Sequence, residues 1–437
     1  MKDSRIEWIG KIPEHWTEGY LKRFGYFISG TGFPHEYQGN MDGDYPFFKV
    51  DDTNLEENSI YMKKANNRIS KKASIELKAK ISPPDSIIFP KIGAALLKNK
   101  RRVLVEPSIF DNNIMSFVPR VGLAKFWFYY LLNIDFYRLV NPGPVPSLSD
   151  SELKSLIIVL PPLIEQKTIA KFLEKEIEKI DSQIKNNQKL IELLKEKRQV
   201  VINQAVTKGL DPTVPMKDSG VEWIGKIPKH WLVSKLKHYT TKIGSGITPK
   251  GGGEVYVDNG IPLIRSQNVH FDGLHLDDVV YITLEIHEEM KNTKLYPSDV
   301  LLNITGASIG RCTYVPPNFG EGNVNQHVCI IRTSNKIYHK FINFFISSSK
   351  IQTFINAIQV GASRQGLTFQ DIGSFEIIIP PIEEQEEISH FIDKKTARLD
   401  NLISEIESQI QRLQEYRQAI ISTAVTGKID VRQEVVA

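Results

Sequence analysis

The sequence predicts an α/β protein with a pseudo-twofold internal repeat: two mixed α/β domains are joined by two long helices that form an antiparallel coiled coil. Three observations predict this fold. The segment Met1–Trp16 (MKDSRIEWIGKIPEHW) returns 215 residues later as Met216–Trp231 (MKDSGVEWIGKIPKHW). The segment Leu160–Asp181 returns 219 residues later as Ile379–Asp400. Both copies of this second segment continue with apolar residues at spacings of three and four, which is typical of coiled-coil helices.

Length and composition limit the class of protein. A chain of 437 residues is long enough for two or three domains with cores of their own. The net charge of +4 excludes a histone-like polycation, so a polyanionic partner must be held by local basic patches. The N-terminus is polar and the longest apolar runs are strand-sized, which predicts a soluble cytoplasmic protein. Cys312 and Cys329 are expected to be two buried thiols rather than a disulfide.

Each half first builds a mixed α/β domain, expected at 1–160 and at 217–379. Strand-like segments of the two domains correspond in order, and two of them lead into small-residue turns at 91–95 and 304–308. Helical spacing with many aromatic residues follows in both domains. The expected strands are Tyr45–Val50, Asp85–Pro90 and Asn112–Val118 in the first domain and Ile261–Ser266, Asp299–Asn303 and Asn325–Ile331 in the second; the expected helices are Phe126–Leu139 and Tyr338–Ile358.

A long helix ends each half, at 161–208 and at 380–425, with a linker at 209–216 and a C-terminal tail at 426–437. Each begins at Pro-Pro, because proline is tolerated in the first helical turn. Gly209 and Pro212 are the stop signals of the first helix. The predicted seam residues are Ile169, Leu173, Ile180, Ile184, Asn187, Ile191 and Leu194 in the first helix and Ile388, Ile392, Leu399, Ile403, Ile406, Ile410 and Leu413 in the second.

The order of the elements predicts how the helices pair. The first helix delivers the chain to the second domain, so the second helix buries its seam against the first only by running back. A helix of this length would hold the two domains about 65 Å apart. Asn187 would lie opposite Ile406, where a polar residue fixes the register or is tolerated on a frayed stretch. Because a twofold protein on DNA reads half-sites with matching spacing, two unlike domains would read two unlike half-sites.

The chain carries no recognisable catalytic motif. Phe27–Gly32 resembles a glycine loop that holds S-adenosylmethionine, but Phe33-Pro34 follows it where a helix should begin. A phosphate-binding loop is absent from the sequence, and Cys312, His327 and Cys329 lack zinc-finger spacing. His15 and His230 are expected to cap and pack the start of each half. We therefore expect no catalytic residue, no metal site and no cofactor bound by this chain.

Basic and amide side chains are the candidate DNA contacts. Clustered lysines and arginines neutralise phosphates, and arginine and glutamine suit bidentate contacts to bases. Lys49 and Arg265 rank first because both follow a strand at equivalent places in the two domains. A solvated surface remains the alternative for any single side chain. The candidates are Lys49, Lys91, Arg101 and Arg102 in the first domain and Arg265, Gln267, Arg311, Arg364 and Gln365 in the second.

Three motifs carry a resemblance to a known family. EWIGKIPxHW opens each half, PPxxEQ begins each long helix, and AVT followed by a glycine ends each helix. Together they resemble the specificity subunit of type I restriction–modification systems along the whole chain. The resemblance implies two target recognition domains that read a split asymmetric site, and helices that set the spacer and dock two methyltransferase subunits. It also implies that restriction/translocase subunits join the complex. S-adenosylmethionine, ATP and magnesium would then belong to the partner subunits.

Two other classes remain as alternatives. An autonomous DNA-modifying or DNA-cutting enzyme would be active as an isolated chain with S-adenosylmethionine or magnesium. A structural tether whose domains bind proteins would ignore DNA sequence and respond little to salt. The repeat and the family resemblance together favour a non-catalytic DNA-recognition and assembly subunit.

Overall fold

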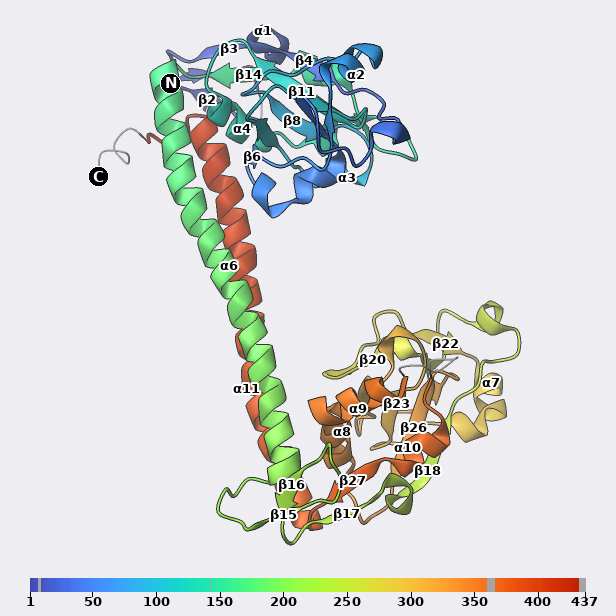
Figure 1. Ribbon diagram of the computed structural model, residues 1–437. Coiled ribbons are helices and arrows are strands. Elements are labelled where there is room, and N and C mark those ends of the chain that lie inside the picture. Colours follow the sequence, from blue (N-terminus) through green and yellow to red (C-terminus); the bar gives the residue numbers. More distant parts are fainter. Residues whose placement is uncertain (7–8, 142, 360–365, 432–437) are drawn as a thin grey trace. The chain divides into compact units, whose positions relative to one another are not determined.

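The chain folds into two compact units in the computed structural model, which describes residues 1–6, 9–141, 143–359 and 366–431 (Figure 1). Unit 1 comprises Met1–Asn187 with Ser408–Ala437, and unit 2 comprises Gln188–Glu407. The long helices α6 (Leu163–Lys208) and α11 (Ile382–Val425) each contribute to both units. Each unit therefore contains one α/β domain, the start of its own long helix and the end of the other one.

Unit 1 is built from short strands and helices before α6. Its elements are β1 (Lys2–Asp3), β2 (Lys11–Ile12), β3 (Thr17–Tyr20), α1 (Leu21–Phe24), β4 (Gly25–Ser29), β5 (Tyr45–Phe48), β6 (Tyr61–Met62), β7 (Arg68–Ile69), α2 (Lys71–Glu76), β8 (Ile87–Pro90), α3 (Ala94–Leu97), β9 (Arg102–Leu104), β10 (Ile109–Phe110), β11 (Ile114–Pro119), α4 (Ala124–Leu132), β12 (Val140–Asn141), β13 (Ser147–Leu148), α5 (Asp150–Ser155) and β14 (Ile157–Leu160). The main sheet has the order β4-β11-β8-β9-β6, beside a sheet β10-β5-β7 and the pair β14-β3. The aromatic helix α4 is buried against the main sheet in the core of the unit.

Unit 2 repeats this plan with a different sequence. Its elements are β15 (Met216–Asp218), β16 (Lys226–Pro228), β17 (Leu232–Lys235), β18 (Thr240–Ser245), β19 (Ile261–Ile264), β20 (Val269–His270), β21 (Gly273–Leu274), β22 (Val280–Ile282), α7 (Leu284–Glu289), β23 (Val300–Asn303), β24 (Cys312–Tyr314), β25 (Asn323–Val324), β26 (Val328–Thr333), α8 (His339–Ser347), α9 (Ser349–Gln359), α10 (Phe369–Ser374) and β27 (Glu376–Ile379). The main sheet has the order β18-β26-β23-β24, beside a sheet β22-β19-β25 and the pair β17-β27.

Both aromatic helices are shorter than predicted. In unit 1, α4 ends at Leu132, and Phe136–Leu139 form a 3-10 helix in which Asp135 accepts a hydrogen bond from the N–H of Tyr137. In unit 2 the predicted helix is split at Ser348, whose backbone is extended and whose hydroxyl donates to the carbonyl of Phe345. Short polar side chains compete for backbone groups at both breaks, which interrupts a helix that apolar spacing alone would continue.

The long helices pair in opposite directions within each unit, as predicted (α6 green and α11 red in Figure 1). In unit 1, the Nε of Arg417 lies 2.9 Å from Asp181 Oδ1. In unit 2, the Nε of Arg198 lies 3.0 Å from Asp400 Oδ1. Adding the repeat offset of 219 converts Asp181 to Asp400 and Arg198 to Arg417, so both units make the same ion pair with exchanged helices.

The apolar faces of the helices join the domain cores. In unit 1, Leu173 near the start of α6 and Ala424 near the end of α11 belong to one core cluster with the first domain. In unit 2, Ile388 and Ala205 do the same with the second domain. The residues predicted for the seam are buried or half-buried. The predicted pairing of Asn187 with Ile406 would join the two units and stays a prediction.

Candidate nucleic-acid interface

A glutamate at the start of each long helix fastens the opening segment of its domain. In unit 1, Trp16 Nε1 donates to Glu165 Oε2 over 2.9 Å, and His15 Nε2 lies 2.5 Å from Glu165 Oε1. We call this contact the tryptophan latch. In unit 2 the latch consists of Trp231 Nε1, which donates to Glu384 Oε2 over 2.9 Å, and His230 Nε2, 2.8 Å from the same oxygen. Both histidines are exposed and contact the glutamate that also accepts from the tryptophan, so they support the start of each half by this contact rather than by burial.

The glutamine that follows each glutamate positions the aromatic helix. Gln166 Nε2 donates to the carbonyl of Pro161 over 2.8 Å, and its Oε1 accepts from the N–H of Leu123 at the start of α4. Gln385 repeats both bonds, to the carbonyl of Pro380 over 2.8 Å and from the N–H of Tyr338 before α8. The PPxxEQ motif thus joins strand, long helix and aromatic helix, and its residues are structural.

Packing requires glycine directly after β4 and directly after β18, at Gly30 and Gly246. A Cβ atom added to Gly30 would lie 1.8 Å from the carbonyl oxygen of Asp111, and one added to Gly246 would lie 1.7 Å from that of Val324. Real Cβ atoms do not approach backbone oxygens so closely, so only glycine fits where this chain crosses the neighbouring backbone. The resemblance of Phe27–Gly32 to a cofactor-binding loop therefore has a steric explanation.

The candidate contacts Lys49 and Arg265 occupy equivalent positions, as predicted. The N–H of Lys49 after β5 donates to Asp52 Oδ2 over 2.6 Å, and the N–H of Arg265 after β19 donates to Asn268 Oδ1 over 3.0 Å. The side chain of Arg265 donates from NH2 to the carbonyl of Asp278 over 3.0 Å. Its buried Nε has no hydrogen-bond partner among the described residues, so part of its donor capacity is unused.

A polar loop between two strands approaches these positions in unit 1. We call residues 111–113 the first reading loop. The N–H of Lys91 donates to the carbonyl of Asn113 over 2.7 Å, and Lys91 Nζ donates to Ser29 Oγ over 3.2 Å. Burial raises the pKa of Asp111, and the positive charge of Lys49 counteracts this rise. Lys49, Lys91 and Asn113 are therefore gathered at one end of the domain.

The equivalent loop in unit 2, residues 325–327, is the second reading loop. The N–H of Ile304 donates to the carbonyl of His327 over 3.0 Å, the counterpart of the bond between Lys91 and Asn113. His327 Nδ1 lies 2.5 Å from Thr305 Oγ1, and the side chain of Gln326 is exposed. We had not predicted Asn113, Gln326 and His327 as contacts. The sequence places all three inside the expected strands Asn112–Val118 and Asn325–Ile331, whereas the observed strands β11 and β26 begin later, at Ile114 and Val328. The polar residues at the start of each expected strand were the signal available in the sequence.

Arg101 is a wrong prediction, because its side chain is 0% exposed. Its guanidinium lies 3.6 Å from the centre of the Phe136 ring and donates to Asn99 Oδ1 over 2.7 Å. Burial lowers the pKa of Arg101 to about 9, so the side chain is still protonated at neutral pH. The register explains the burial: Ile88 pairs with Arg102 as Leu301 pairs with Thr313, so Arg101 takes the core position that Cys312 fills in unit 2.

The other candidate side chains differ in their exposure to solvent and in the hydrogen bonds that they already make. Arg102 is half-buried and donates to the carbonyls of Arg101 and Thr53 over 2.7 Å and 3.0 Å. Gln267 is exposed and lies 2.5 Å from Asp278 Oδ2, whereas Arg311 is half-buried behind the 304–308 turn. Arg364 and Gln365 lie outside the described residues.

The cysteines are buried free thiols, as predicted. Burial raises the pKa of Cys329 to about 12, so neither a thiolate nor a zinc ligand forms readily there.

None of the helices in the described ranges is both long and apolar enough to cross a membrane.

The two units place different polar side chains on equivalent strand ends and loops, which is the arrangement of a duplicated recognition protein. Sequence comparison identifies its family. Residues 13–195 and 228–412 match the family described as "Type I restriction modification DNA specificity domain". The two matches cover most of the chain, so the chain belongs to this family, as the motifs predicted. It is therefore a DNA-recognition subunit rather than a catalytic one.

Curated relatives agree with this assignment. The chain is 27% identical to the type I restriction enzyme EcoBI specificity subunit of Escherichia coli, over 74% of this chain and 70% of that protein. It is 24% identical to the MjaVIII specificity subunit of Methanocaldococcus jannaschii, over 97% and 95%.

Two solved structures share the fold. One comes from work on complex assembly and conformational transition of the type I R-M system, with a TM-score of 0.73 at 15% identity over 96% of this chain and 100% of that chain. The HsdS subunit from Thermoanaerobacter tengcongensis gives a TM-score of 0.53 at 15% identity over 98% and 100%.

Proposed function

We propose that each domain reads one half of a split, asymmetric DNA site for a type I restriction–modification complex. The target recognition domains would be 1–160 and 217–379, and the coiled coil would set the spacer and dock two methyltransferase subunits. Restriction/translocase subunits would join for cleavage. S-adenosylmethionine, ATP and magnesium would act in those partners, and the complex would work in the cytoplasm.

One observation carries the split-site proposal: equivalent positions hold different hydrogen-bonding groups. Lys49 offers an ammonium group where Arg265 offers a guanidinium, and Asn112 and Asn113 of the first reading loop correspond to Gln326 and His327 of the second. Guanidinium and amide side chains recognise guanine and adenine edges by bidentate hydrogen bonds, whereas lysine acts more as a point charge. Two surfaces with the same placement and different chemistry are suited to two different half-sites.

The proposed DNA contacts follow from this comparison. Lysines at the rim would neutralise phosphates and make affinity fall as salt rises. Side chains with unused donors would reach base edges. The proposed contacts are Lys49, Lys91, Arg102 and Asn113 in the first domain and Arg265, Gln267, Arg311, Gln326, His327, Arg364 and Gln365 in the second.

Mapping of methylated sites tests the proposal. The chain is purified with its cognate methyltransferase, and the methylated positions on genomic DNA are sequenced. We expect a split asymmetric motif. Replacing residues 30–150 by the corresponding region of another family member should change the first half-site alone. Methylation at a continuous palindrome, or a change in both half-sites, would contradict the proposal.

Single substitutions sharpen this test. Gln326→Ala should relax the second half-site and leave the first unchanged, because loss of one bidentate contact costs about 1–3 kcal/mol of discrimination. Gln370→Ala, at another exposed glutamine of the same domain, is the matched control. Equal effects of both substitutions would remove Gln326 from the proposed contacts.

Insertion of whole heptads tests the spacer role of the helices. Seven residues added after Asn187 in α6 and seven added after Ile406 in α11 lengthen both helices by about 10 Å. This length corresponds to about three base pairs of spacer, since successive pairs rise 3.4 Å. The half-sites should not change. An unchanged spacer in a folded variant would exclude the spacer role, and insertion into one helix alone serves as the control that loses register.

A further inference from the structure

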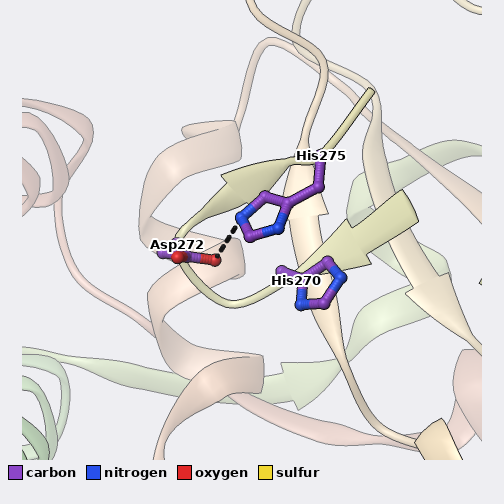
Figure 2. Close-up of side chains that lie close together, drawn as sticks. All are labelled: His270, Asp272 and His275. Atoms are coloured by element: carbon purple, nitrogen blue, oxygen red, sulfur yellow. Dashed lines mark ion pairs between the residues drawn. The ribbon is translucent and has the colours of Figure 1, made fainter. Parts of the chain in front are cut away.

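The hairpin formed by β20 and β21 in unit 2 presents a histidine, an aspartate and a second histidine on one surface (Figure 2). His270 ends β20, Asp272 lies in the turn, and His275 directly follows β21. This cluster takes no part in the tryptophan latch, the ion pairs between the long helices or the hydrogen bonds of the reading loops.

The strand register explains why the histidines share a face. His270 pairs with Gly273, and the N–H of His275 donates to the carbonyl of Asn268 over 2.9 Å. Side chains alternate along a strand, so His270 and His275 are diagonal neighbours on the outer face of the hairpin. The other face carries Val269, which is buried in the core of the unit. Because Val269 is buried on one face of the hairpin, the histidines lie on the opposite, outer face.

The donor atoms already converge in the absence of a metal ion. One nitrogen or oxygen atom from each of the three side chains lies within 4.8 Å of the others. His275 Nε2 lies 3.1 Å from Asp272 Oδ1, and the two imidazole rings stack with centres 4.0 Å apart. His270 Nε2 lies 2.8 Å from the carbonyl oxygen of Gln267, a contact in which the nitrogen donates. This bond leaves Nδ1 of His270 with its lone pair free for a ligand.

We propose that His270, Asp272 and His275 bind a divalent first-row transition metal ion, with zinc as the ion to test. Imidazole nitrogen and carboxylate oxygen are usual ligands of this class of ion. Ligand atoms around tetrahedral zinc are separated by about 3.4 Å, given metal–ligand bonds near 2.1 Å. Shifts of about 1 Å close this gap, and the exposed side chains of Asp272 and His275 can make them. Three protein ligands leave one position open to water.

The site would stiffen the segment proposed to contact DNA. His270 is tied to the carbonyl of Gln267, and the side chain of Asn268 donates to the carbonyl of His275 over 2.9 Å. Arg265 begins the same turn. In unit 1 the matching segment has no histidine, and the amide of Asn58 fastens it by donating to the carbonyls of Asp52 and Lys64. This consequence rests on the proposed function, whereas the metal site itself does not.

Metal titration of the whole chain tests the site. The chain is prepared without a histidine tag, stripped with a chelator and titrated with Zn²⁺ alone, and Co²⁺ serves as the spectroscopic probe. We expect one equivalent to bind and the Co²⁺ absorption to report nitrogen ligation. Asp272→Asn and His275→Ala should weaken binding at least about tenfold. His35→Ala, at an exposed histidine of unit 1, is the control that should leave binding unchanged.

The results separate the site from its role. Failure of the folded wild-type chain to bind the ion, or equal binding by His275→Ala, would overturn the proposal. Circular dichroism checks the fold, which should persist because Asp272 and His275 are exposed. In methylation mapping, His275→Ala should relax the second half-site alone. If the wild-type chain binds the metal ion but the second half-site read by His275→Ala is unchanged, the link between the metal site and recognition is overturned. A wild-type chain that reads no split site would instead contradict the proposed function.

Discussion

The two units share their supporting contacts and differ in the surfaces that these contacts support. The tryptophan latch, the helix-opening glutamine and the crossed ion pair recur with nearly the same distances in both units. The strand ends and reading loops recur in position and change in chemistry: Lys49 corresponds to Arg265, and Asn112 and Asn113 correspond to Gln326 and His327. An internal repeat therefore separates the residues that hold the fold from those that distinguish one half from the other.

Gly30 and Gly246 provide the largest expected effect. Replacing either by alanine should lower the free energy of unfolding of its own unit by about 3 kcal/mol, since the new Cβ overlaps a backbone oxygen. Urea unfolding combined with hydrogen exchange, which assigns the loss to a unit, measures the effect. Gly32→Ala is the matched control, because among the described residues nothing lies within 4 Å of its added Cβ. Equal stability of the two variants would show that the loop adjusts.

The tryptophan latch should give an intermediate effect in both units. Glu165→Ala removes the acceptor of Trp16 Nε1 and should cost about 1–3 kcal/mol, because the largely buried indole N–H loses its partner. Glu384→Ala should cost a similar amount in unit 2. Thermal unfolding measures both, with Glu178→Ala on the exposed face of α6 as the control. A strong effect in one unit alone would end the view that the latches are equivalent.

The crossed ion pairs should contribute least. Both lie partly exposed to solvent, so double-mutant cycles on Arg417 with Asp181 and on Arg198 with Asp400 should each give a coupling of about 0.5 kcal/mol. The coupling should fall as salt rises, because ions screen exposed charges. A coupling that differs strongly between the two cycles would indicate that the helices pack differently in the two units.

The fold was predictable because the repeat compares the chain with itself. An offset of 219 aligns both Pro-Pro starts, both seams and both members of the ion pairs, and the long helices follow from spacing alone. The breaks at Asn133–Asp135 and at Ser348 were not predictable from apolar spacing, because side-chain hydrogen bonds to the backbone decide them.

The candidate interface was only partly predictable. Lys49 and Arg265 could be aligned by their strands, but Arg101 stands in a run of basic residues that looks solvent-exposed. Only the strand register shows that Arg101, directly before β9, faces the core, whereas Arg102 is half-buried. The cluster of His270, Asp272 and His275 escaped attention because its spacing fits no helical metal motif. A tight hairpin brings these residues together, and its register becomes visible only in three dimensions.

The division of each long helix between the units has a consequence for synthesis on the ribosome. Unit 2 is one uninterrupted stretch, so all its parts have been made once Glu407 has been added. Unit 1 must wait for Ile420, Ala424 and Val431, which complete the core around Ile9 and Trp16. The N-terminal domain, although translated before unit 2, would then close after it, and its unfinished apolar surface would stay accessible to chaperones until Val431 has been made.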